Sequence, residues 1–221
     1  MDSLVNINGD NVQTLEILFL TTLITLLPSL LVMMTSFTRY IVVFSFLRSA
    51  MGTQQTPPNI VLIGIALFLT LITMSPVITQ IQTEAYEPYV AEEITQEEFM
   101  DRAQVPLKEF MLRQTDTSTL EMFCDMDQSI EVPETDEEAM ALPLRIIVPS
   151  FMTCELKRAF EIGFYLYIPF MLIDIVVSST LMSMGMIMLP PSMISMPFKL
   201  LLFISINGWE LLFSTLVQGF R

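Results

Sequence analysis

Residues 17–38, ILFLTTLITLLPSLLVMMTSFT, decide the fold class, because they hold no charged side chain over 22 positions. As an α-helix this stretch would be about 33 Å long, which matches a bilayer hydrocarbon core of about 30 Å. Three further apolar stretches, at residues 60–83, 159–189 and 193–217, are also long enough to cross a membrane. We therefore expect an all-α membrane protein of long, kinked helices and helical hairpins, in one domain over residues 1–221.

Proline residues mark where these helices should bend or stop. The first helical segment is expected over residues 17–48 with Pro28 inside it, and Pro76 and Pro169 lie inside later segments. Because a proline removes one backbone hydrogen bond, each should kink its helix. Two breaks separate the segments: the polar turn GTQQTPPN at residues 52–59, and Pro190-Pro191.

An acidic insert, residues 84–145, lies between the second and third apolar segments. Residues 84–138 hold 17 of the 24 acidic side chains and three basic ones, which accounts for the whole net charge of −14. Such a stretch could be a solvated loop, but its Ser/Thr-x-x-Glu motifs favour short helices, because each fits a capping box. The predicted helix starts are Thr95, Ser118 and Thr135, with Pro106 in the first turn of another helix over residues 106–114.

The composition argues against an enzyme and against a nucleic-acid-binding protein. The chain contains no histidine, the commonest general base and metal ligand. It has no nucleophile, metalloprotease or phosphate-loop motif, and no basic patch that would bind nucleic acid. Cys124 and Cys154 lack zinc-site spacing and are expected to be unpaired thiols. We therefore expect no cofactor, no metal ion and no catalytic residue.

Ionisable side chains in the apolar segments are candidate functional residues, because each costs about 2.5–3.5 kcal/mol at the centre of a membrane helix. Asp174 lies midway through the third segment, Lys199 lies near the start of the fourth, and Glu155 just before the third is a second possible partner for Lys199. A proton or ion relay would need more titratable groups than these. We therefore favour an ion pair that fixes helices or subunits together.

Methionine recurs at every second position from Met182 to Met188, with Gly185 among them. Because positions i and i+2 do not share a helix face, residues 182–188 are expected to form an irregular loop. At membrane depth such a loop survives only where protein buries it or where it lines a cavity. Methionine is flexible enough to close around irregular shapes. Two interpretations stay open: a deformable apolar seal, or methionine-rich core packing.

Basic residues predict a membrane orientation only in part. Arg39 and Arg48 flank the first turn and place it on the cytoplasmic side by the positive-inside rule. The N-terminus and the acidic insert would then lie outside. The start of the chain is acidic where a secretory signal would be basic, so no cleavable signal is expected. The basic residues that argue for the opposite orientation are Arg145, Lys157 and Arg158, just before the third segment.

Long motifs in both halves match one family. The first half contains MMTSFTR (33–39), SFLR (45–48) and MGTQQTPPN (51–59), and the insert contains PLKEFMLRQT (106–115). The second half contains ELKRAFEIGF (155–164), MSMGMIMLPP (182–191) and PFKLLLF (197–203). With these motifs nearly the whole chain after about residue 15 resembles the FliP family of flagellar biosynthetic proteins.

The resemblance implies a core export-gate subunit of the bacterial flagellar type III secretion apparatus, in the inner membrane at the flagellar basal body. Several copies would assemble with FliQ and FliR, together with FlhA and FlhB, into a closed conduit for unfolded flagellar proteins. It also implies helices that pack mainly on one another and stand partly above the membrane plane, in contact with lipid elsewhere.

The resemblance also implies roles for particular residues. Glu155 and Lys199 match positions that pair between subunits, with Asp174 as a further buried charge. The pore constriction carries over to Met184, Met186, Ile187 and Met188, and the family-signature turn to Gly52, Gln54, Gln55, Pro57 and Pro58. The alternative function is an ion or solute transporter with Asp174 and Lys199 as coupling residues. Inverted repeats would favour that alternative, but the two halves show no internal symmetry.

Overall fold

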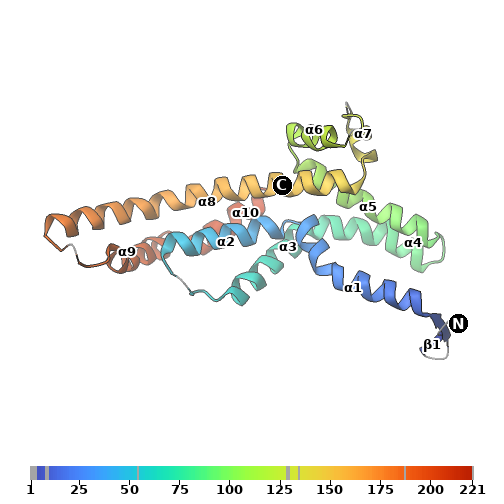
Figure 1. Cartoon of the computed structure of the whole chain (residues 1–221), viewed down its shortest axis with the longest axis horizontal. Helices are drawn as coiled ribbons and strands as arrows, with labels where there is room; N and C mark the ends of the chain where they lie inside the picture. The colour runs from blue at the N-terminus through green and yellow to red at the C-terminus, as the bar shows by residue number, and fades with distance from the viewer. Residues whose placement is uncertain are drawn as a thin grey trace.

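The chain folds into an elongated set of helices, and the longest helix runs along most of its length (Figure 1). The computed structural model describes residues 4–7, 10–53, 55–127, 130–133, 135–186 and 188–220. The helices outside the insert are α1 (Thr14–Met34), α2 (Phe37–Met51), α3 (Asn59–Ile81), α8 (Leu144–Ser183), α9 (Pro191–Ser205) and α10 (Gly208–Gln218). The insert contributes the π-helix η1 (Gln82–Tyr86) and the helices α4 (Glu87–Val90), α5 (Gln96–Arg113), α6 (Thr117–Met126) and α7 (Asp136–Ala141).

A short antiparallel hairpin precedes α1. Its strands are β1 (Leu4–Ile7) and β2 (Asp10–Gln13), with Val5 opposite Val12. No pattern in the sequence predicted this hairpin. The remaining elements are helical, so the prediction of an all-α membrane protein is confirmed.

The centre of the molecule is the packing of α2 against α8 (Figure 1). The buried side chains of α2 recur every three or four residues, as a helix with one apolar face requires. Gly163 of α8 lies against the ring of Phe46, where an added Cβ would come within 2.5 Å of ring carbons. The absence of a side chain at Gly163 therefore allows the two helices to approach closely. The α2 residues that form this core are Phe37, Tyr40, Val43, Phe44, Leu47, Ala50 and Met51.

The insert is folded around a second apolar core and packs on the first part of α8 (Figure 1). Met111 of α5, Cys124 of α6 and Phe151 of α8 are fully buried there. Cys124 and Cys154 are both buried free thiols, as predicted, and burial raises the pKa of the Cys124 thiol. A solvated acidic loop is therefore the wrong description of this region.

The helix starts within the insert were predicted only in part. Thr95 caps α5 with a complete capping box, and Thr135 accepts a hydrogen bond from the Glu138 amide at the start of α7. The prediction for Ser118 is wrong, because the N-cap of α6 is Asp116, two residues earlier, and the helix begins at Thr117. The prediction for Pro106 is also wrong. This proline lies inside α5, buried on its apolar face, and does not begin a new helix.

Two of the expected continuous segments are bent pairs of helices. The end of α1 meets α2 at 82°, and α9 meets α10 at 63°. At the first bend the hydroxyls of Thr35 and Thr38 bind the carbonyls of Leu31 (2.5 Å) and Val32 (2.7 Å). These hydroxyls satisfy backbone groups that a continuous helix would pair with amides. The second bend is at Asn207, which adopts φ = 51°.

The other two segments are longer than predicted. α3 continues through η1 into α4, so that one run of 32 residues extends from Asn59 to Val90. α8 begins at Leu144, although the apolar pattern predicted a start at residue 159, and it contains 40 residues. Among the described residues, these two runs are long and apolar enough to cross a membrane. If each bent pair is also one span, the number of possible spans rises to four.

Candidate functional site

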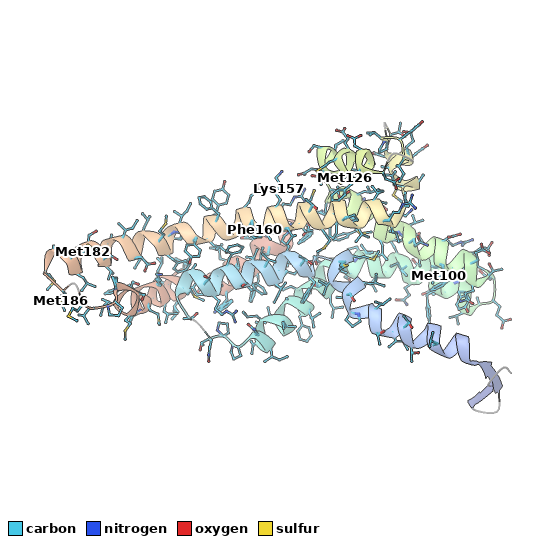
Figure 2. The ribbon with its side chains drawn as sticks, in the orientation of Figure 1. Met100, Met126, Lys157, Phe160, Met182 and Met186 are labelled. Atoms are coloured by element: carbon cyan, nitrogen blue, oxygen red, sulfur yellow. The ribbon has the colours of Figure 1, made fainter. Side chains whose placement is uncertain are left out.

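The methionine loop, residues 184–190, connects α8 to α9 at one end of the molecule (Figure 2). Gly185 adopts φ = 75°, a conformation that glycine favours, and the Met186 amide donates to the Leu181 carbonyl at 3.0 Å. The irregular part begins at Met184. Met182 belongs to the last turn of α8, so the prediction that the loop starts there is wrong.

The side chains of this loop are exposed. Met184, Met186 and Met188 are 68%, 40% and 98% exposed, whereas Met111 in the insert is fully buried. Ile187, the fourth residue of the expected constriction, lies outside the described residues. Within the described residues of this chain, the loop methionines are therefore not part of either apolar core.

Asp174 and Lys199 form an ion pair between α8 and α9. Lys199 Nζ lies 2.6 Å from Asp174 Oδ2 and also donates to the Ala50 carbonyl at 3.0 Å. Ser195 Oγ donates to the other carboxylate oxygen of Asp174 at 2.6 Å. Both charges therefore have a counter-charge and a polar neighbour, which offsets the cost of removing them from water.

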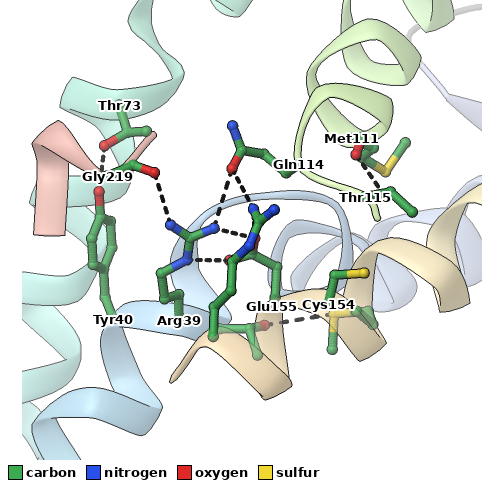
Figure 3. A network of polar contacts seen from close by, with 12 residues as sticks. Arg39, Tyr40, Thr73, Met111, Gln114, Thr115, Cys154, Glu155 and Gly219 are labelled. Atoms are coloured by element: carbon green, nitrogen blue, oxygen red, sulfur yellow. Dashed lines mark hydrogen bonds and ion pairs between the residues drawn. The ribbon is translucent and has the colours of Figure 1, made fainter. Parts of the chain in front are cut away.

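Glu155 pairs with Arg39 in the interior, between α8 and α2 (Figure 3). Arg39 Nε lies 2.8 Å from Glu155 Oε2, and Nη2 lies 2.5 Å from Oε1. Glu155 is fully buried and Arg39 is 2% exposed. Within this chain Glu155 and Lys199 thus have different partners, and a pair between them in two subunits stays a prediction.

Further polar groups extend this pair to the insert. Gln114 Oε1 accepts hydrogen bonds from Arg39 Nη2 at 3.2 Å and from Arg158 Nη1 at 2.8 Å. Arg158 and Lys157 both reach Asp116, at 3.3 Å and 3.2 Å. In the sequence, Arg39 marks membrane orientation and ends the MMTSFTR motif, and neither feature predicts its pairing with Glu155. The available signal was that Glu155 and Arg39 both lie at the edge of apolar segments, where each needs an opposite charge.

The signature turn connects α2 to α3. Gly52 ends α2 with φ = 76°, and its amide donates to the Ser49 carbonyl at 3.1 Å. Pro58 is the N-cap of α3, and Arg48 Nη1 donates to Asn59 Oδ1 across the turn. Gln54 lies outside the described residues, whereas Gln55 and Pro57 lie between these two ends.

Two apolar grooves follow the seam between α8 and the last two helices. The first, about 540 Å³, lies between α8 and α9 near Val176, Leu181 and Phe198. The second, about 450 Å³, lies nearer the centre, beside Leu166 and Phe203. No group of three His, Cys, Asp or Glu side chains among the described residues could hold a metal ion.

The fold and these sites define a helical membrane protein whose interior charges are paired across helices and whose one end carries an exposed apolar loop. The chain belongs to the FliP family, which it matches over residues 20–216. It is similar to the flagellar biosynthetic protein FliP of Aquifex aeolicus (strain VF5), with 48% identity over 214 residues, 96% of this chain and 88% of the relative. Its similarity to the protein of the same name from Bacillus subtilis (strain 168) is 44% over 225 residues and covers 100% of both chains. For the Caulobacter vibrioides protein of that name the identity is 46% over 224 residues, 99% of this chain and 83% of the relative.

Proposed function

We propose that the chain is a core subunit of the export gate of the bacterial flagellar type III secretion apparatus. Its relatives are flagellar biosynthetic proteins, which supports a role in flagellar protein export. Several copies assemble with FliQ and FliR, next to FlhA and FlhB, in the inner membrane at the flagellar basal body. The assembly is a closed conduit for unfolded flagellar proteins, and the chain itself catalyses no reaction.

Large exposed apolar surfaces support assembly with other chains and with membrane lipid. Soluble monomers rarely expose contiguous apolar patches larger than a few hundred Å². Here α3, α8 and α9, among other helices, present bulky apolar side chains to the outside, and the two grooves beside α8 are lined almost entirely by apolar groups. Examples of these exposed side chains are Ile60 and Phe68 on α3, Phe164 and Val176 on α8, and Leu201 and Ile204 on α9.

The exposure of the methionine loop is the observation that supports its proposed role as an apolar seal of the conduit. Met188 is 98% exposed at the tip of the molecule, although burial of a methionine side chain is energetically favourable. Copies of the loop that met at a common axis would bury these side chains against one another. The seal then comprises Met184, Met186, Ile187 and Met188. It would yield to a passing chain because methionine is unbranched and flexible.

The double substitution Met186→Ala with Met188→Ala tests the seal. We expect the complex to be recovered in the parent amount, while cells that express it become leaky to small ions, measured as conductance and growth sensitivity. Met111→Ala is the matched control, because truncation of a buried methionine costs about 2–5 kcal/mol and should lower recovery of the complex. A double variant that assembles fully and stays as tight as the parent would rule out these residues as the seal.

The transporter alternative depends on Asp174 and Lys199. A coupling residue must bind and release its ion, whereas both of these groups are already paired with each other and hydrogen-bonded to Ser195 and Ala50. This arrangement favours a structural ion pair, and we therefore do not adopt the transporter function.

A further inference from the structure

Arg39 contacts three other parts of the chain from its position on α2 (Figure 3). Its guanidinium donates to Glu155 on α8, to Gln114 at the end of α5 and to the Gly219 carbonyl at the end of α10, the last at 3.1 Å. The ring of Phe220 lies 3.5 Å from the guanidinium carbon. A single buried side chain on α2 thus contacts α8, the acidic insert and the C-terminal segment.

The hydrogen-bond pattern of Arg39 leaves it little freedom to rearrange. An arginine has five N–H donors in a planar fork, and four hydrogen bonds to protein acceptors are formed here. Lysine could not replace it, because an ammonium group is compact and lacks the fork. The contact to Gln114 uses Nη2 and the contact to Gly219 uses Nη1, so the two contacts do not compete for one nitrogen.

Two helix ends converge on this group. Gln114 is the C-cap of α5 and Gly219 is the C-cap of α10. The C-terminal end of a helix carries a partial negative charge, which a nearby cation stabilises. Arg39 lies at both ends, and Arg158 also binds Gln114. Loss of either helix end would leave a buried cation with fewer acceptors, which is costly at low exposure.

We propose that Arg39 is a shared positioning residue that couples the acidic insert to the C-terminal segment, so that release of either one loosens the other. The physical reason is that each contact restricts the same guanidinium, and the second contact then costs less ordering entropy. Such coupling is reciprocal: the effect of the insert on the C-terminal segment equals the reverse effect. The proposal concerns the chain itself and holds whether or not the chain forms a gate.

Phe220 offers a second route between the same two parts, which the test must separate from the first. Its ring lies 6.1 Å from that of Phe110 on α5 and 5.6 Å from that of Tyr40. The Gln114→Ala variant removes the acceptor that Arg39 shares with Arg158 and leaves these ring contacts in place. The Phe220→Leu variant removes the ring contacts and leaves the Gly219 carbonyl in place.

Amide hydrogen exchange of the purified full-length chain tests the coupling. For Gln114→Ala we expect amides of residues 215–220 to exchange roughly five-fold faster or more, a typical size for coupling between sites. Removal of residues 219–221 should accelerate exchange at residues 111–116 by a similar factor. The matched control is Arg113→Ala, which removes an exposed side chain of the same α5 turn that pairs with Glu109. Arg113→Ala should leave the amide exchange rates of residues 215–220 as they are in the parent.

Arg39→Lys separates the hydrogen-bond route from the ring contacts. With lysine at position 39 we expect Gln114→Ala to have no further effect on residues 215–220. If Arg39→Lys does not fold, Gln114→Ala and Phe220→Leu in the native background still distinguish the two routes, because the first removes only the hydrogen-bond route and the second removes only the ring contacts. Parent-like exchange at residues 215–220 in Gln114→Ala would overturn the proposal. So would an Arg39→Lys chain in which Gln114→Ala still accelerates them, because the coupling would then follow the rings.

Discussion

Lys199 shows how a charged residue is accommodated within an apolar helix of this chain. Its side chain is nearly buried, and its ammonium lies between the Asp174 carboxylate and the Ala50 carbonyl. Asp174 is the more exposed partner, with 38% of its side chain accessible. The pair therefore holds α8, α9 and the end of α2 in a fixed relation.

Charge reversal at this pair gives a residue-scale prediction. We expect Lys199→Glu alone to destabilise the folded chain by about 3 kcal/mol, the lower end for broken buried pairs, because Asp174 is partly exposed. The double variant Lys199→Glu with Asp174→Lys should recover most of that loss. The measurement is thermal unfolding of the detergent-purified chain, monitored by the fluorescence of Trp209, its one tryptophan.

A second double variant tests the pair expected between subunits. Lys199→Glu with Glu155→Lys recovers assembly only if these two residues meet across an interface, and it should not restore the stability of the single chain. If the double variant Lys199→Glu with Asp174→Lys is as unstable as Lys199→Glu alone, the ion pair between Lys199 and Asp174 does not stabilise the folded chain.

Glu98 gives a prediction of pH dependence. The Thr95 amide donates to Glu98 Oε2 at 2.9 Å, and this bond holds the pKa of the Glu98 carboxyl below its ordinary value. The ionised carboxylate is the favoured form in the fold, so its stabilising effect is fully present above the ordinary glutamate pKa. It is lost as the pH falls through the lowered pKa.

Amide exchange at the start of α5 measures this effect. Protection of residues 96–99 should be greater in the parent than in Glu98→Gln at pH 7, and the ratio should approach one as the pH falls below 4.5, the ordinary value. Glu97→Gln in the same turn is the matched control and should not change the pH dependence. A ratio that stays constant with pH would contradict the assignment of the cap to the carboxylate.

At this scale the sequence identified the charges better than their partners. Asp174, Lys199 and Glu155 could be recognised as costly because they lie in or beside apolar segments. Their partners could not be chosen, because Glu155 and Arg39 are separated by 116 positions and only the packing of α2 on α8 brings them together. The role of Gln114 had no sequence signal, since an amide at the end of a helix is ordinary.

The contact between α2 and α8 gives an element-scale prediction. An added methyl group at Gly163 would meet the Phe46 ring at 2.5 Å, so Gly163→Ala should destabilise the chain by about 1–3 kcal/mol, the usual cost of overpacking. Gly64 of α3 is the matched control, because it is also helical and a Cβ there meets nothing within 4 Å. Gly64→Ala should stabilise by about 0.8–1 kcal/mol through helix propensity alone.

The same unfolding measurement checks this prediction, and Phe46→Leu provides a further test. If the clash with the ring is the cause, Gly163→Ala should cost less in the Phe46→Leu background. Equal unfolding temperatures for Gly163→Ala and the parent would show that the ring can move aside and that the close approach is not required.

Helix ends were the least predictable elements, and each error has a physical reason. Pro106 was expected to begin a helix, but α5 has a complete capping box at Thr95 and buries the proline on its apolar face. The start of α8 was placed at residue 159 because the preceding turns carry charges. Those turns pack on the insert, so their polar side chains have protein partners there and do not mark a helix end.

The length of α8 bears on how the whole molecule meets a membrane. Forty residues of α-helix measure about 60 Å, about twice the thickness of a hydrocarbon core. Ordinary tilt cannot absorb this difference, so we expect part of α8 to extend beyond the hydrocarbon if the helix crosses the bilayer. The first part of α8 contacts the insert (Figure 1). This part is the polar one, and the insert holds the net negative charge of the chain.

The contact between the polar part of α8 and the insert also explains the conflict in the predicted membrane orientation. Arg145, Lys157 and Arg158 argued against the orientation that the first turn favoured. In the fold they pair with carboxylates of the insert, Arg145 with Asp127 at 3.1 Å and the other two with Asp116. Basic residues that are neutralised by the protein in this way are weak markers of a membrane side. Four apolar stretches were thus predictable from composition, whereas the polar first part of α8 depends on contacts with the insert.

The exposed methionine loop makes one end of the molecule chemically vulnerable. Peroxide converts methionine to its sulfoxide, a polar and chiral group that fits poorly in an apolar contact. Met184 and Met188 are open to such an oxidant, whereas Met74 and Met111 are enclosed by the fold. In the free chain, Met188 should therefore be oxidised first, because at 98% it is the most exposed of the described methionines, and its repair by methionine sulfoxide reductases would restore the apolar surface. Copies that have buried the loop against one another would be protected, so resistance to peroxide would report how far assembly has proceeded.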